Sequence, residues 1–459
     1  MAFDIELRRS LIWVLAFLVT PGIMLSLQVV SRYAFAVHVQ PSLVDTMTAA
    51  LAIVFITYSG VATGLVAVFV WDALAFDRRD AMVLGPLPVR GTTVIAAKLG
   101  ALGAFLLGTA IGTNALAAAL FALVASGSKG FVAFGLHAVA QLTATVAAGV
   151  FIFSSLITIR GVLVFVRGLR LSAALGALMQ LTFMGALFSS ILLLPAALKT
   201  IAASAGDISH RAWLPTAWFL GLYETLRGRQ TADFVALAAR AMSATALAVA
   251  VAVAVSIAGY RRQQQLALAP PSHLGSDCRL GLGGRIARRL IGRDRVARAA
   301  LDFFLITLAR NRALRPMITM NAAVAISVVA AALWGTGLDL SALARPRTIV
   351  FWIPLVAAFW VVIGIRASFF VPSEPSAAWT FDANEPPTSH AYRDAARAAI
   401  LGLVLPSVLT VSAIVTTGLL GWRVAVWHTL FVAGVVAMLV EVVLLTIDRL
   451  RSGSSPTGA

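Results

Sequence analysis

The chain has 459 residues, of which 60% are hydrophobic and only 12% are charged, and its mean hydropathy is +0.92. Soluble domains carry about 25% charged residues, and no water-soluble fold could bury this much apolar side chain, so a soluble domain is excluded. The net charge of +17 does not indicate a nucleic-acid partner, because Lys and Arg stand mainly between hydrophobic runs. The single cysteine, Cys278, excludes an intrachain disulfide.

Apolar runs long enough to cross a hydrocarbon core of about 30 Å recur along the chain. They predict an all-α polytopic transmembrane helical bundle with about ten spans. The expected spans are Leu11 to Val30, Leu51 to Val70, Leu99 to Ala125, Val132 to Ile159, Leu171 to Leu194, Phe234 to Ala258, Met317 to Gly335, Ile349 to Ile365, Ala398 to Leu420 and Val424 to Ile447. The first is interpreted as a retained helix, because it lacks a small-residue cleavage site and further spans follow it.

Basic residues concentrate in alternate connections, as expected for cytoplasmic loops. Arg8 and Arg9 precede the first span, and Arg449 and Arg451 follow the last, so the N- and C-termini are both expected in the cytoplasm. The stretch from Lys199 to Arg240 is the exception, because it carries several arginines but must lie outside if there are ten spans. The prediction of ten spans therefore depends on this stretch lying outside the cytoplasm.

The basic connection divides the predicted protein into unequal parts. Residues 1–260 form a six-span membrane domain, residues 261–315 a basic cytoplasmic linker, and residues 316–459 a four-span region with a cytoplasmic loop at 366–397. Within the linker, Ile286 to Arg298 predicts a short basic amphipathic helix lying on an anionic inner leaflet.

The loop over residues 71–98 carries the most functional information. It is too charged to span a membrane, yet it contains apolar residues and two prolines, which end one helix and start another. The pattern favours a helix, a turn and a second helix lying against the membrane. Its characteristic residues are Asp77, Arg78, Arg79, Asp80, Leu84, Leu87, Pro88, Val89, Arg90 and Lys98.

In this order, these residues resemble the coupling element of the membrane subunit of ABC-type exporters of the second class. In that family an acidic and basic helix leads into a Leu-x-x-Leu-Pro-Val turn and then a lysine at the third span. The resemblance covers about residues 1–260 and implies that this loop docks into a partner ATPase.

A second part of the resemblance lies in the segment 199–233, between the fifth and sixth expected spans. Family members place short re-entrant outer helices there, and the aromatic content suits a membrane interface. The residues that carry this similarity are Trp213, Pro215, Trp218, Tyr223 and Glu224.

The resemblance implies a permease that performs no covalent chemistry and needs no cofactor. The chain has no phosphate-binding loop of its own, so ATP hydrolysis is expected in a separate ATP-binding-cassette subunit. The other expected partners are the lipid bilayer and a second permease copy, and the expected location is the cell membrane, the inner one in bacteria. The cargo is expected to be hydrophobic or amphipathic.

Glu441 is the clear acidic residue inside an expected span, and such groups are costly in lipid. A structural role is the favoured interpretation, through an interhelical partner such as His137, Gln141 or Asn114 or through a water-filled groove, and a proton relay is the alternative. The six histidines are scattered and none pairs at metal-ligand spacing, so no metal site is expected.

Other classes of function remain open on the sequence alone. An ion-coupled secondary transporter should show matched helix breaks in two repeats, which are not evident. A membrane enzyme acting on lipid-linked substrates would use the loop 366–397, where Glu374 and Glu385 are the candidate acid and base. The favoured interpretation of that loop is an interfacial elbow anchored by Trp379 and Phe381, and a non-transporting scaffold is a further alternative.

Overall fold

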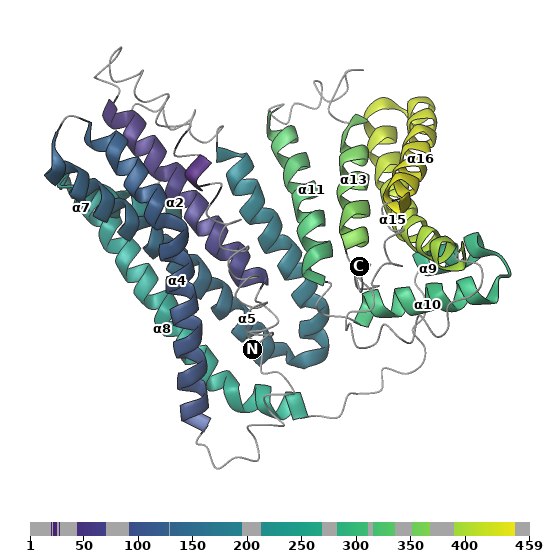
Figure 1. Ribbon diagram of the computed structural model, residues 1–459, viewed down its shortest axis with the longest axis horizontal. Coiled ribbons are helices and arrows are strands. Elements are labelled where there is room, and N and C mark those ends of the chain that lie inside the picture. Colours follow the sequence, from purple (N-terminus) through teal and green to yellow (C-terminus); the bar gives the residue numbers. More distant parts are fainter. Residues whose placement is uncertain are drawn as a thin grey trace, which may run out of the picture. The chain divides into compact units, whose positions relative to one another are not determined.

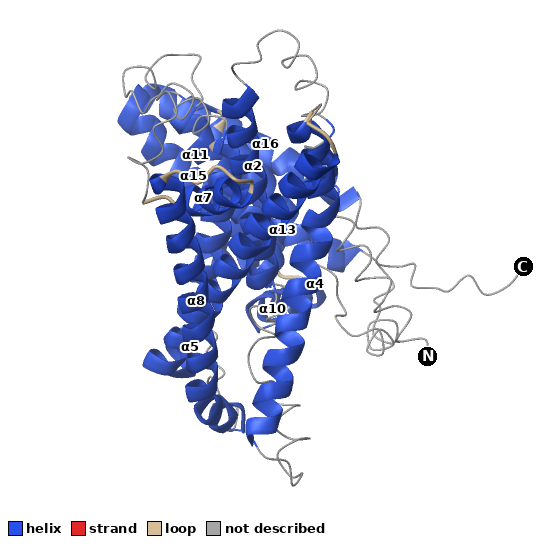
Figure 2. Ribbon diagram, turned by 90° about the vertical axis from the view of Figure 1, so that its left-hand side faces the viewer, coloured by secondary structure: helices blue, strands red, loops and turns tan. Residues whose placement is uncertain are grey.

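The computed structural model describes residues 20, 22–24, 27, 44–69, 91–127, 129–194, 213–268, 282–310, 315–335, 351–367 and 390–445. Within these ranges the backbone consists of helices joined by short turns, and none of it is β-strand (Figure 2). The all-α prediction is therefore confirmed for the described part of the chain. The segment 70–90, which contains the characteristic residues of the expected coupling loop up to Arg90, lies outside the described residues.

Seven described helices are long and apolar enough to cross a membrane. They are Met47–Phe69, Gly91–Ser126, Phe131–Leu163, Ala232–Gly259, Met317–Trp334, Ala391–Leu420 and Trp422–Leu445. Each coincides with one of the ten expected spans. Two further expected spans correspond to shorter apolar helices, Leu178–Leu192 and Ile353–Arg366. The first expected span lies mostly outside the described residues.

The chain divides into two compact units. Unit 1 comprises residues 1–176 and 190–270, and unit 2 comprises residues 177–189 and 271–459. Helix α5 (Phe131–Leu192) runs without a break, so the connection between the fourth and fifth expected spans is itself helical. This helix contributes residues to both units.

In unit 1, α2 (Val44–Phe69) is the central helix, buried along most of its span. It contacts α4 (Gly91–Ser126) and α7 (Pro215–Leu226), and α7 lies against α8 (Ala232–Leu268) (Figure 1). A helix that is apolar around its whole circumference is suited to such a central place. Helices approach closely where residues are small: a side chain at Gly149 of α5 would meet Thr63 of α2 at 3.0 Å.

In unit 2, α15 (His390–Leu420) and α16 (Trp422–Leu445) form a hairpin that turns at Gly421, where φ is +85°. Val432, Val436 and Val440 of α16 are fully buried and recur every fourth residue, so they form one continuous seam. The opposite face of α16 exposes Trp427 and Phe431, which are as apolar as the seam. A helix with two apolar faces is suited to a lipid environment.

The remaining helices of unit 2 are α9 (Leu282–Ile291), α10 (Arg295–Arg310), α11 (Arg315–Gly335) and α13 (Ile353–Ala367). The expected single helix over Ile286 to Arg298 is wrong in its bounds, because the chain breaks at Gly292, where φ is +69°. Asp294 then caps α10, since its Oδ1 accepts a hydrogen bond from the Val296 N–H at 2.9 Å. Both α9 and α10 pack against α15.

Candidate functional site

The segment expected between the fifth and sixth spans forms the short helix α7. Leu214 precedes it in an extended conformation, and Pro215 occupies the first turn, where its missing N–H costs nothing. The helix has 12 residues, about 18 Å at ~1.5 Å per residue, and so is too short to cross a membrane. Gly228, with φ of +101°, then turns the chain back into α8.

Most of α7 is buried inside unit 1. Its buried residues are Ala217, Phe219, Leu220, Gly221, Leu222, Tyr223 and Glu224. Gly221 lets α7 approach α8, because a side-chain carbon there would lie 3.0 Å from the carbonyl oxygen of Phe234. By contrast, Trp213, just before the helix, is 73% exposed. The segment 199–233 thus contains a short helix, and α7 is more deeply buried than an interfacial element would be.

Tyr223 links α7 to α5. Its hydroxyl oxygen lies 2.7 Å from His137 Nδ1, and both side chains are buried. The Tyr223 ring also packs edge-on against Phe121 of α4, with 5.8 Å between ring centroids. A single side chain of α7 thus touches both α4 and α5.

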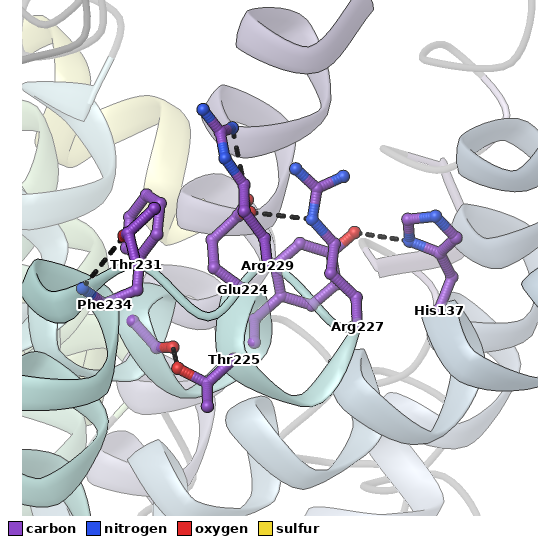
Figure 3. Close-up of polar contacts among 9 residues, drawn as sticks. His137, Glu224, Thr225, Arg227, Arg229, Thr231 and Phe234 are labelled. Carbon is purple, nitrogen blue, oxygen red and sulfur yellow. Dashed lines mark hydrogen bonds and ion pairs between the residues drawn. The ribbon is translucent and has the colours of Figure 1, made fainter.

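Glu224 places a carboxylate inside the same part of unit 1. Its side chain is 0% exposed, and Arg227 Nε lies 2.7 Å from its Oε2. Arg229 is farther away, at 4.0 Å, and its side chain is 50% exposed. The Arg227 guanidinium also lies over the Tyr223 ring, 5.7 Å from the centroid. Because burying a charge without a partner is costly, Arg227 is the group that makes this burial tolerable (Figure 3).

Replacing Tyr223 with phenylalanine tests the link to α5. The substitution keeps the ring packing but removes the hydroxyl, so it should cost about 1 kcal/mol and lower the melting temperature by about 2–4 °C. Tyr392→Phe is the matched control, because the Tyr392 hydroxyl has no hydrogen-bond partner among the described residues. Thermal unfolding of the purified chain, followed by tryptophan fluorescence, measures both. Equal melting temperatures for the two variants would contradict a stabilising hydrogen bond between Tyr223 and His137.

A second polar cluster connects α4 and α5 to α2. Asn114 of α4 donates from Nδ2 to Ser59 Oγ of α2 at 2.9 Å. Ser59 Oγ donates in turn to the carbonyl oxygen of Thr145 on α5 at 2.8 Å. These bonds connect three membrane helices, and they satisfy polar groups that lipid could not.

Glu441 is paired differently from the expectation. Arg397 of α15 binds it through two contacts, Nε to Oε1 at 2.5 Å and Nη2 to Oε2 at 2.9 Å. Arg397 also binds Asp394 at 2.9 Å, so the group lies near the polar start of α15. The Glu441 side chain is 46% exposed rather than enclosed in a core. The expected partners His137, Gln141 and Asn114 were therefore wrong, because the carboxylate is bound by Arg397.

Sequence reasoning did not assign two participants in the α7 site. Arg227, the C-cap residue of α7, follows Glu224 by three residues, a spacing that brings side chains together at a helix and could have been read from the sequence. His137 stands 86 residues from Tyr223, and no local pattern indicates that pairing. In the described ranges, no three His, Cys, Asp or Glu side chains gather in a group that could hold a metal ion.

No family model matches the sequence, and no curated protein or solved structure matches it either. The class of protein therefore follows from the helices themselves. In the described part of the chain, seven apolar helices of spanning length, several of them with apolar outer faces, define a multi-pass α-helical membrane protein.

Proposed function

We propose that this protein is the permease subunit of an ATP-driven exporter in the cell membrane, the inner membrane in bacteria. It crosses the bilayer about ten times with both termini in the cytoplasm and moves a hydrophobic or amphipathic cargo. A separate ATP-binding-cassette subunit hydrolyses ATP, and a second permease copy completes the pathway. The observation that carries the proposal is α7, a short buried helix at the position where the resembled exporter permeases have re-entrant outer helices.

The arrangement of unit 1 supports mechanical coupling through the membrane. The segment 71–98, expected to dock on the ATPase, begins just after the end of α2, and its last residues, from Gly91 on, form the first turns of α4. Helix α7 contacts α2 directly and is bound to α5 through Tyr223 and His137. A displacement of α2 by the ATPase would therefore also displace α7, which packs against it. The loop can transmit that displacement only if it binds the ATPase differently in its two states.

Charge reversal in the loop tests the proposal. The chain is co-expressed with an ATP-binding-cassette ATPase encoded in a neighbouring reading frame, and the complex is purified through a tag on the permease. We expect the triple variant R78E/R79E/R90E to insert normally but to lose the ATPase. The matched control K129E/R293E/R423E reverses three exposed charges outside this loop and should retain the ATPase.

Two results would contradict the exporter proposal. One is full retention of the ATPase by the loop variant. The other is cargo movement in proteoliposomes that follows an ion gradient and ignores ATP, which would favour an ion-coupled secondary transporter.

A further inference from the structure

Helix α9 has one face that packs tightly inside unit 2. Gly284 and Ala287 are buried, and the helix crosses α15 at Gly402. A side-chain carbon at Gly402 would lie 2.6 Å from both the Ala287 Cβ and the Gly283 carbonyl oxygen. The two backbones are therefore in contact, and α9 is fixed to α15 along this face.

A second apolar stripe on α9 is largely exposed and is not covered by the described residues of unit 2. Leu282 is 62% exposed and Leu290 is 53% exposed, with the half-buried Ile286 between them. The three residues recur every fourth position, so they form one line along the helix. This line lies beside the face that packs on α15 and is separate from it. Helix α9 thus presents apolar side chains outward as well as inward.

Exposed arginines flank the uncovered stripe. Arg288 is paired with Asp302 through two contacts, at 3.0 and 2.7 Å, so its charge is compensated. Arg285 and Arg289 are exposed, and within the described ranges no carboxylate pairs with either of them. Two guanidinium groups that have no carboxylate partner among the described residues, beside the line of Leu282, Ile286 and Leu290, form an amphipathic surface of positive charge.

The depth of α9 can be estimated along α15. The polar turn of α15 ends at Arg397, and the apolar part begins at Ala398. Gly402 lies four residues farther on, about 6 Å at ~1.5 Å per residue. Interfacial helices are buried about 5–10 Å into the boundary between headgroups and acyl chains. Figure 1 shows α10 running roughly at right angles to α13, and both α9 and α10 contact α15.

We propose that α9 lies in the membrane interface and that Arg285 and Arg289 bind the headgroups of anionic phospholipids. The stripe of Leu282, Ile286 and Leu290 contacts the acyl chains, and the arginine stems extend toward the headgroups. A soluble acidic partner fits less well, because it would leave the leucines exposed to water. The proposal does not depend on the exporter function.

The test compares the full chain in nanodiscs of phosphatidylcholine alone and of phosphatidylcholine mixed with phosphatidylglycerol. We expect the wild type to melt about 4–8 °C higher in the anionic mixture, and R285Q/R289Q to lose most of that gain. The matched control K129Q/R423Q removes two exposed charges elsewhere and should keep it. Glycerol phosphate added to the detergent-solubilised chain should give no gain.

A second measurement tests whether the apolar stripe of Leu282, Ile286 and Leu290 contacts the acyl chains. In a C278S background, a fluorophore on L290C should be quenched by lipids with brominated acyl chains, and one on R285C should be quenched less. The proposal is overturned if the wild type melts equally in both lipids, if R285Q/R289Q keeps the gain, or if the control loses it equally. Equal quenching at the two positions, or a gain from glycerol phosphate, would overturn it as well.

Discussion

Replacing Arg227 with methionine should destabilise the protein more than any other single change in the α7 site. Glu224 is 0% exposed and Arg227 only 10% exposed, so the substitution would leave a carboxylate buried without its nearest cation. Breaking a buried ion pair in this way costs about 3–5 kcal/mol. The expected fall in melting temperature is about 10 °C or more, measured by tryptophan fluorescence of the purified chain.

The chain provides a matched control two residues away. Arg229 lies 4.0 Å from the same carboxylate, but its side chain is 50% exposed, so Arg229→Met should cost at most about 1 kcal/mol. The double variant E224Q/R227M removes both charges and should recover most of the stability lost in R227M. If R227M and R229M were equally stable, Arg227 would not be the group that stabilises the buried carboxylate of Glu224.

The membrane helices were predictable because hydropathy is a local property of the sequence. A span requires about 20 consecutive apolar residues, and such a run can be read without knowing its neighbours. The α7 segment was singled out differently, by its resemblance to the re-entrant outer helices of exporter permeases and by its aromatic residues. Hydropathy did not indicate that residues 160–171, including Arg160 and Arg170, continue as helix between two expected spans.

The partners of the polar residues were not predictable, because they depend on which helix faces meet. Glu441 and Arg397 are 44 residues apart, and Tyr223 and His137 are 86 apart. Composition indicates that a charge in a membrane helix needs a partner, but it does not say which one. Local signals were still overlooked: Gly292 followed by Asp294 is a helix end followed by a new cap, and it divides the expected linker helix in two.

Replacing Gly402 with alanine should separate α9 from α15. The added methyl group would lie 2.6 Å from the Ala287 Cβ and 2.9 Å from the Ala287 backbone nitrogen, and backbone atoms cannot rotate away. Overpacking of this kind costs about 1–3 kcal/mol. Loss of the contact should also open α9 to trypsin at Arg285 and Arg289, so limited proteolysis gives a second measurement.

Gly434 of α16 supplies the matched control, because an added methyl group there meets nothing within 4 Å. In that position alanine favours the helix by about 0.5–1 kcal/mol, so G434A should raise the melting temperature slightly while G402A lowers it. The same substitution therefore has opposite effects in the two helices of one hairpin. If G402A were as stable as the wild type and equally resistant to trypsin, the α9–α15 contact would be looser than the structure indicates. Helix α9 would then not be held at the depth on which its lipid contacts depend.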